Sequence, residues 1–242
     1  MTELLFLTDA YLAEFDATVA DVTDDGGVVL DRTAFYIGGG GQPCDVGTLT
    51  DPASDAMYQV TKAGRGGGAI VHTIDGDQRP AVGATLHGTI DWERRYLLMR
   101  THTALHILCG VVWRDYGAFV TGGDMQPGRA RMDFELENMS AEFAEEVEAR
   151  INAEVAAARD IGVDFMNRAD ADAHPDLIRT KINLLPAAIS EVRTIDIRGL
   201  DLQADGGTHV HNTREVGRIS VVGHESKGRI NKRLRIALAE MG

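Results

Sequence analysis

The stretch Met99-Arg-Thr-His-Thr-Ala-Leu-His-Ile-Leu108 places two histidines, His102 and His106, four residues apart. On an α-helix, residues at this spacing lie one turn above each other, so their imidazoles can converge on one point. The same spacing is also compatible with a polar patch or a buried histidine pair that binds nothing. About a hundred residues later, Asp205-Gly-Gly-Thr-His209 offers two more side chains of metal-binding type. Together, His102, His106, Asp205 and His209 predict a tetrahedral or near-tetrahedral zinc site.

These two stretches resemble the editing domain of alanyl-tRNA synthetases and the free-standing AlaX proteins, which deacylate mischarged alanine tRNA. The resemblance covers nearly the whole chain, and it rests on several motifs in the same order. In the N-terminal third, Phe35-Tyr36, Gly39-Gly-Gly-Gln-Pro43, Asp45 and Gly47 resemble the family's glycine-rich motif. The other motifs are Asp91-Trp-Glu-Arg-Arg95, Arg131-Met-Asp-Phe134, Asn152 and Ser226-Lys-Gly-Arg-Ile-Asn-Lys-Arg-Leu-Arg235.

The resemblance implies an α+β fold with two domains. Residues 1–90 would form a small β-barrel like those of translation factors, carrying the glycine-rich loop. Residues 91–242 would form a metal-binding editing domain of the threonyl/alanyl-tRNA synthetase second-additional-domain type. The pattern of the first 90 residues agrees with many short strands, because extended stretches alternate with turn signals such as Asp24-Asp-Gly-Gly27 and Asp75-Gly76. The strands are expected at 17–22, 28–30, 33–36, 56–60, 69–74 and 85–90.

Helices are expected after the domain boundary near Ile90-Asp91. Asp91 is a suitable N-cap for a short helix through Met99, and Thr101 could cap a second helix that runs to Asp115, with Gly117 as its stop. Apolar residues recur every four positions from 139 to 159, which predicts a helix with a buried face. The stretch 120–123 is expected to be a glycine turn, and strands are expected at 130–135 and 192–197.

The composition predicts a folded protein of one large or two modest domains. The chain has 242 residues, of which 44% are hydrophobic, and no run of about 20 apolar residues that would span a membrane. The N-terminus lacks the basic region of a signal peptide, and the two cysteines do not suggest a disulfide framework. We therefore expect a cytoplasmic protein with no membrane partner.

The net charge of −13 conflicts with RNA binding, because phosphate contacts normally need lysine and arginine. The conflict is reduced by a basic cluster near the C-terminus, in which Lys227, Arg229, Lys232 and Arg233 are expected to meet tRNA phosphates. A solvated basic strand end is the alternative. The acidic composition is typical of a surface adapted to high salt, although a GC-rich coding bias would also favour aspartate over lysine. DNA is not an expected partner.

The substrate contacts that we expect come from the glycine-rich loop and from the histidine helix. Consecutive glycines allow positive φ angles and a close approach of another molecule. A loop containing Gly39, Gly40, Gly41, Gln42 and Asp45 would close over the amino acid or the terminal adenosine, and the resemblance links this motif to the selection of serine. A flexible hairpin tip is the alternative. Thr103 is a further candidate for contact with the substrate hydroxyl.

One residue of the metal stretch departs from the family pattern. The family usually has Cys-Gly-Gly-Thr-His, whereas this chain has Asp205 in place of the cysteine. A carboxylate is a legitimate zinc ligand, and it would leave more positive charge on the ion than a thiolate does. Alternatively, Asp205 only caps a turn, and the site is made of histidines alone or is lost. Cys109 lies roughly 10 Å along the helix from His102 at ~1.5 Å rise per residue, too far to share an ion.

The predicted function is trans-editing: a metal-dependent aminoacyl-tRNA deacylase that hydrolyses alanine tRNA mischarged with serine or glycine. His102, His106 and His209 would be the catalytic residues, holding one zinc ion that activates water or anchors the substrate. No serine or cysteine nucleophile set stands out, so water is the simplest nucleophile. Two alternatives remain, a hydrolase of the same fold with another aminoacyl-tRNA or ester as substrate, and a non-catalytic RNA-binding or regulatory module. The oligomeric state does not follow from the sequence.

Overall fold

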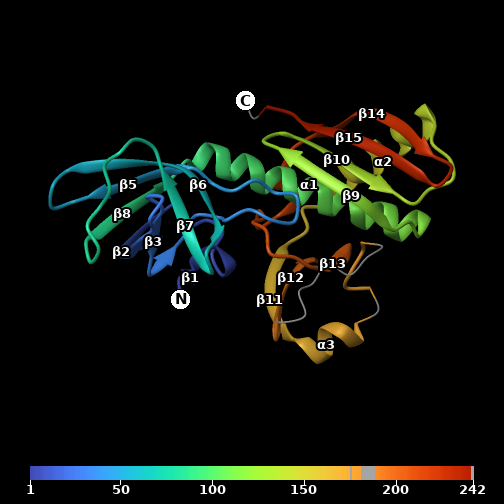
Figure 1. The fold of residues 1–242 in the computed structure, drawn as a ribbon. Helices are drawn as coiled ribbons and strands as arrows, with labels where there is room; N and C mark the ends of the chain where they lie inside the picture. The colour runs from blue at the N-terminus through green and yellow to red at the C-terminus, as the bar shows by residue number, and fades with distance from the viewer. Residues whose placement is uncertain (175, 181–188, 241–242) are drawn as a thin grey trace. The chain divides into compact units, whose positions relative to one another are not determined.

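The computed structural model describes residues 1–174, 176–180 and 189–240 (Figure 1). The chain divides into two compact units, Met1–Tyr96 and Leu97–Gly242. The division falls inside helix α1 (Trp92–Tyr116), a few residues after the boundary expected near Ile90.

The first unit is a closed barrel of six strands, in the order β2-β3-β7-β6-β5-β8. Apolar side chains at alternate positions, such as Val19, Leu49 and Leu86, point inward and are almost fully buried. A short parallel pair, β1 and β4, and the 3-10 turn η1 complete the unit. The bounds are β1 (Glu3–Leu4), η1 (Leu5–Leu7), β2 (Glu14–Val22), β3 (Val28–Leu30), β4 (Arg32–Thr33), β5 (Gly47–Asp51), β6 (Ala56–Gly66), β7 (Ala69–Ile74) and β8 (Thr85–Ile90).

The second unit combines helices with two antiparallel sheets. One sheet has four strands in the order β14-β15-β10-β9, and the other has three in the order β11-β12-β13. The bounds are β9 (Val120–Gln126), β10 (Arg129–Phe134), α2 (Ala141–Ala156), β11 (Ile161–Asn167), α3 (Arg168–Ala173), β12 (Glu191–Ile197), β13 (Asp201–Ala204), η2 (Thr213–Val216), β14 (Ile219–Gly228) and β15 (Asn231–Leu238). The α+β class, with a barrel in the N-terminal region, is confirmed.

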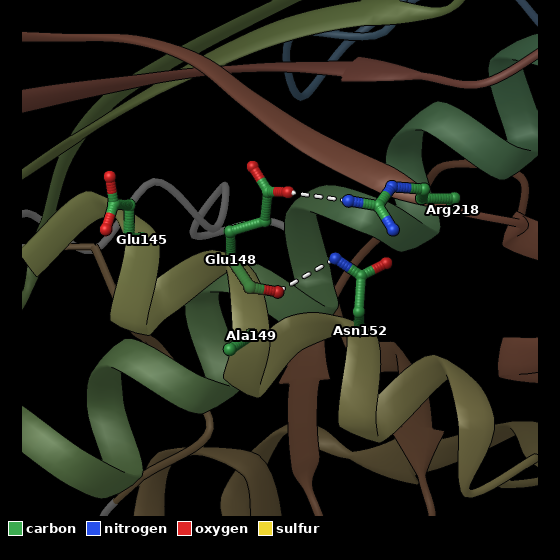
Figure 2. Close-up of a pocket in the computed structure, with 5 residues that line it drawn as sticks. All are labelled: Glu145, Glu148, Ala149, Asn152 and Arg218. Atoms are coloured by element: carbon green, nitrogen blue, oxygen red, sulfur yellow. Dashed lines mark hydrogen bonds and ion pairs between the residues drawn. The ribbon is translucent and has the colours of Figure 1, made fainter. Parts of the chain in front are cut away.

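Helix α2 is joined to the four-stranded sheet through Asn152. Its side-chain oxygen accepts the Ile219 N–H at 3.0 Å, and its amide nitrogen donates to the Ile219 carbonyl at 2.7 Å. Figure 2 shows the shallow hollow beside this contact, lined by Glu145, Glu148, Ala149, Asn152 and Arg218. An ion pair of 3.2 Å joins Glu148 and Arg218 in this hollow, so these two charges already have partners within the protein.

Three local expectations were wrong. The two helices expected around Met99 are one continuous helix, α1, because the Thr101 hydroxyl donates to the Leu97 carbonyl at 2.6 Å inside the helix instead of capping a new one. The stretch 120–123 begins strand β9, where Gly122 and Gly123 pair with β10. The strand expected at 33–36 is reduced to the two residues of β4. Within the described residues, no helix is long and apolar enough to cross a membrane.

Candidate metal centre

The second unit brings together the four side chains expected to bind a metal. His102, His106, Asp205 and His209 each offer one ligand atom, and these atoms all lie within 4.8 Å of one another. Helix α1 supplies the first two histidines, and the loop after β13 supplies Asp205 and His209. The rings of His102 and His209 stack with centroids 4.3 Å apart, and His106 meets His209 edge-on at 4.6 Å. The donor set of three imidazoles and one carboxylate fits a four-coordinate zinc ion.

A tight turn holds Asp205 against the histidines. Its Oδ2 accepts the Gly207 N–H at 2.6 Å and lies 3.1 Å from His209 Nε2. Its Oδ1 lies 3.7 Å from His102 Nε2. The carboxylate therefore caps the turn and faces the cluster at the same time. From the sequence alone, a turn cap and a metal ligand are alternative roles for Asp205, and its position in the structure is compatible with both.

Burial keeps two of the three histidines, His102 and His209, in the neutral form that binds metals. Burial lowers the pKa of His102 to about 4, and burial together with the neighbouring His102 places the pKa of His209 well below its usual value. Burial alone would raise the pKa of Asp205, but the histidines outweigh it and hold this pKa well below the usual value. At neutral pH, the cluster therefore contains neutral His102 and His209 beside an ionised carboxylate.

Thr103 is fully buried and supports a ligand instead of facing an open pocket. Its hydroxyl oxygen lies 3.1 Å from His209 Nδ1 and accepts the Val210 N–H at 3.3 Å. The expected contact of Thr103 with substrate stays a prediction, and within the chain its hydroxyl contacts a candidate metal ligand. Since the Thr103 oxygen meets Nδ1, the other nitrogen of His209, Nε2, is the one directed at Asp205.

A carboxylate that the sequence reading missed, Asp201, lies on the far side of His106. Its Oδ2 is 3.6 Å from His106 Nδ1, and its side chain is fully buried. Burial pushes the pKa of His106 down, but Asp201 and Asp205 outweigh burial and leave it raised. In the sequence, Asp201 is an acidic residue in a short strand, four residues before Asp205. The sequence alone does not distinguish such a buried aspartate from an exposed one.

In the first unit, the glycine-rich motif forms a loop closed at its base. The Asp45 N–H donates to the Tyr36 carbonyl at 2.9 Å, and the Tyr36 N–H donates to Asp45 Oδ2 at 2.6 Å. Asp45 also forms a buried ion pair with Arg95. Asp45 thus has a structural role at the base of the loop, and its expected contact with substrate stays a prediction. Gln42 is likewise buried, whereas the three glycines Gly39, Gly40 and Gly41 at the tip are exposed.

The basic cluster near the C-terminus lies on strands β14 and β15. Lys227 and Arg229 are exposed where the two strands meet. Lys232 is buried, and its Nζ donates to Ser226 Oγ and to the carbonyls of Gly228 and Arg229 at 2.6–3.0 Å. Arg233 donates to both oxygens of Asp133. Lys232 and Arg233 therefore stabilise the sheet, and the expected phosphate contacts of the four residues stay a prediction.

Comparison with known proteins gives concordant results. The family of class II (A) tRNA synthetases matches residues 6–94, and the threonyl and alanyl tRNA synthetase second additional domain matches residues 192–235. The alanyl-tRNA editing protein AlaX-M of Methanosarcina barkeri is 37% identical over 99% of this chain and 100% of its own length. AlaX-M of Saccharolobus solfataricus is 38% identical, with 97% and 98% covered. An alanine–tRNA ligase of Thermofilum pendens is 37% identical over 93% of this chain but 24% of its own. With this identity along nearly its whole length, the chain belongs to the AlaX-M family of alanyl-tRNA editing proteins.

Proposed function

We propose that this protein hydrolyses the ester bond of alanine tRNA charged with the wrong amino acid, using a metal ion held by His102, His106, Asp205 and His209. The observation that carries the proposal is the convergence of these four donors within 4.8 Å in a chain of the AlaX-M family. Because its substrate would be a tRNA used in translation, we place the protein in the cytoplasm.

When bound at this site, zinc supplies a Lewis acid that can polarise a carbonyl or lower the pKa of a water molecule. The chain contributes the rest. The three histidines are almost fully buried, so they hold their positions and limit the access of bulk water. The Asp205 side chain is 13% exposed, more than the side chain of His102 or His209, and we propose that the ester approaches the cluster from this side.

Serine is the wrong amino acid that we favour as substrate, with glycine as the second. To accept serine and reject alanine, a site must bind the serine hydroxyl favourably, and a polar pocket can do this through hydrogen bonds. The exposed glycines of the loop, Gly39, Gly40 and Gly41, are the proposed contacts for the end of the tRNA, with Gln42 beside them. The exposed cations Lys227 and Arg229 are the proposed phosphate contacts.

The test is the rate of amino-acid release from Ser-tRNA(Ala), Gly-tRNA(Ala) and Ala-tRNA(Ala), with and without chelator, at low and high salt. The proposal expects selective release of serine or glycine that chelator abolishes and zinc restores, and that His102→Ala removes. Release that survives both chelator and His102→Ala would rule out the metal mechanism.

The same experiment separates the alternatives. Hydrolysis of a different aminoacyl-tRNA in a wider panel would indicate a hydrolase of the same fold with another substrate. The observation that favours a non-catalytic RNA-binding module is the replacement of the usual cysteine by Asp205. No release at any salt concentration, together with no stoichiometric metal in the purified protein, would support that module.

A further inference from the structure

Asp201 is a carboxylate buried directly behind the candidate metal site. It begins strand β13, and its side chain has no exposed surface. Burying a carboxylate is costly unless it is paired, so a fully buried aspartate beside a functional site calls for a reason. Three neighbouring side chains provide this reason, because each of them places a nitrogen close to the Asp201 carboxylate. They are His106 on α1, Gln203 on the same strand and Arg179 from the segment 176–180.

The contact with His106 determines which ring nitrogen is free for the metal. His106 Nδ1 lies 3.6 Å from Asp201 Oδ2, so Nε2 is the nitrogen left for the four-donor cluster. His209 has the same arrangement, with Nδ1 at the Thr103 hydroxyl and Nε2 at Asp205. Two candidate ligands from different elements thus have an oxygen of the scaffold beside Nδ1, at 3.6 Å for His106 and 3.1 Å for His209. A histidine held in this way presents one tautomer and one orientation to a metal.

Asp201 is itself held from two sides. Gln203 donates to Oδ2 at 2.5 Å, and Arg179 Nε lies 3.4 Å from Oδ1. The Arg179 guanidinium in turn lies over the Trp113 ring, 4.5 Å from its centroid, with 8% of the side chain exposed. A cation over an indole face in a buried place is a stabilising contact. The chain of contacts Trp113, Arg179, Asp201 and His106 therefore runs from the scaffold to a ligand.

Asp201 and His106 could form a stronger hydrogen bond than the contact that the structure shows. At 3.6 Å it is slightly longer than a hydrogen bond, and neither His106 Nδ1 nor Asp201 Oδ1 makes a hydrogen bond within the described residues. A cation at Nε2 withdraws electron density from the ring, which makes the Nδ1–H a stronger donor toward a carboxylate. The pair is thus arranged to strengthen when Nε2 is engaged.

We propose that Asp201 is a positioning residue, held by Arg179 and Gln203, that keeps the proton of His106 on Nδ1 and directs Nε2 at the metal. The proposal rests on the metal site of the proposed function, but not on the identity of the substrate. It makes two predictions, one about metal affinity and one about the tautomer of a single histidine.

The first test compares the zinc affinity of Asp201→Asn with that of the wild-type protein, by competition with a chelator of known affinity. In the variant, one oxygen becomes an amide donor that cannot serve His106 or Arg179, since both are donors. The expected loss is about 10- to 100-fold, the usual effect of removing the partner of a metal ligand. The matched control is Asp133→Asn, which alters another buried carboxylate of this unit, one that binds Arg233 at 2.6 and 2.8 Å and contacts no ligand. Its zinc affinity should stay within about 3-fold of wild type, and an equal loss in the two variants would overturn the proposal.

The second test needs no variant and decides the question even if Asp201→Asn fails to fold. Long-range ¹H–¹⁵N correlation spectra of the zinc-loaded wild-type protein report which nitrogen of His106 carries the proton. The proposal expects Nδ1–H with Nε2 bound to zinc, and the opposite tautomer would overturn it. If the tautomer and the affinity loss are as expected but Ser-tRNA(Ala) is not hydrolysed, the proposed substrate is wrong and the role of Asp201 stands.

Discussion

Asp45 and Arg95, fifty residues apart in the sequence, form an ion pair in which neither side chain is more than 1% exposed. Arg95 Nε donates to Asp45 Oδ2 at 2.8 Å, and the other guanidinium nitrogens donate to the carbonyls of Ala10 and Ala34 at 2.9 and 2.6 Å. The same carboxylate accepts the Tyr36 N–H. One buried pair thus joins the first turn of α1 to the base of the glycine-rich loop.

Removing one partner of this pair should destabilise the protein strongly. Asp45→Ala leaves the Arg95 charge buried and uncompensated, for which the usual cost is about 3–5 kcal/mol. The free energy of unfolding, measured in urea by circular dichroism, should fall by that amount. Asp16→Ala, which removes an exposed carboxylate beside His87, is the control and should cost less than about 1 kcal/mol. Similar losses in the two variants would contradict the role assigned to the buried pair.

Changing Asp205 should alter both the affinity and the selectivity for metals. Asp205→Ala should weaken zinc binding by more than the roughly 10- to 100-fold expected for loss of a supporting residue. Asp205→Cys should bind zinc more tightly than wild type and discriminate better against manganese, because a thiolate is a softer ligand than a carboxylate. Chelator competition with each ion measures both effects, and Cys109 is unchanged in all three proteins. Zinc affinity of Asp205→Ala equal to wild type would indicate a site made of histidines alone.

The barrel should lose stability in acid through His72. This side chain is fully buried, with Nδ1 at the Val28 carbonyl and Nε2 at the Thr33 hydroxyl, and burial lowers its pKa to about 4. Below pH 6.5, His72 is protonated in the unfolded chain but stays neutral in the folded chain. The free energy of unfolding therefore falls as the pH drops from 6.5 to about 4. The full effect is about 3 kcal/mol at 1.36 kcal/mol per pKa unit.

The measurement is the difference in unfolding free energy between wild type and His72→Gln at pH 7.5 and at pH 4.5. The subtraction removes the contributions of the other titrating groups. The advantage of wild type should shrink by about 2–3 kcal/mol at the lower pH. A difference that does not change with pH would show that His72 does not stay neutral in the folded barrel.

Replacing the two lysines of the basic cluster, Lys227 and Lys232, should have different effects on tRNA binding and on stability. Lys227→Ala removes an exposed cation, so tRNA affinity should fall and the slope of log affinity against log salt should decrease by about one. Lys232→Ala removes three hydrogen bonds from a buried ammonium, so its main effect should be a lower melting temperature. Filter binding over a range of salt concentrations, beside thermal unfolding, tests both, and the same change of slope in both variants would contradict the assignment.

The glycine loop should affect catalysis more than zinc binding. At Gly39, φ is 132°, a conformation that side chains disfavour, although an added Cβ would meet nothing closer than the Tyr36 hydroxyl at 3.7 Å. Gly39→Ala should therefore reshape the loop locally and lower kcat/KM for Ser-tRNA(Ala), with zinc affinity unchanged. Single-turnover deacylation and chelator competition are the two measurements. Unchanged deacylation would remove the loop from the proposed contacts.

The sequence predicts most of the barrel strands from local patterns, and it predicts the four side chains that lie together in the candidate metal centre from two motifs and their resemblance to a known family. It fails at helix α1, where Asp91 and Thr101 are equally good N-cap residues by type. The structure shows why only one helix forms: the Thr101 hydroxyl bonds back to Leu97 and also accepts the Gly128 N–H, a partner that only the tertiary fold provides. The same limit applies to Gly122 and Gly123, which look like a turn but are held in a strand by pairing with β10.

The supporting residues of the site could not be predicted for a similar reason. Thr103 and Asp201 are ordinary polar residues in sequence, and their roles come from what lies opposite them after folding. Thr103 faces His209 across 106 positions of the chain, and Asp201 faces His106 across nearly as many. Spacing within one helix or one turn indicates candidate ligands, whereas the groups that contact those side chains come from other elements of the fold.

The four-donor cluster contains no sulfur, which affects how the site would respond to oxidants. A cysteine ligand can be oxidised by peroxide, stepwise to acids that no longer hold a metal, whereas imidazole and carboxylate have no such ladder under mild conditions. Of the two cysteines, Cys109 is buried, and burial raises the pKa of its thiol well above the usual value, which disfavours the reactive thiolate. If these four side chains hold the metal, an oxidant that disables thiolate ligands has no sulfur to attack within the cluster.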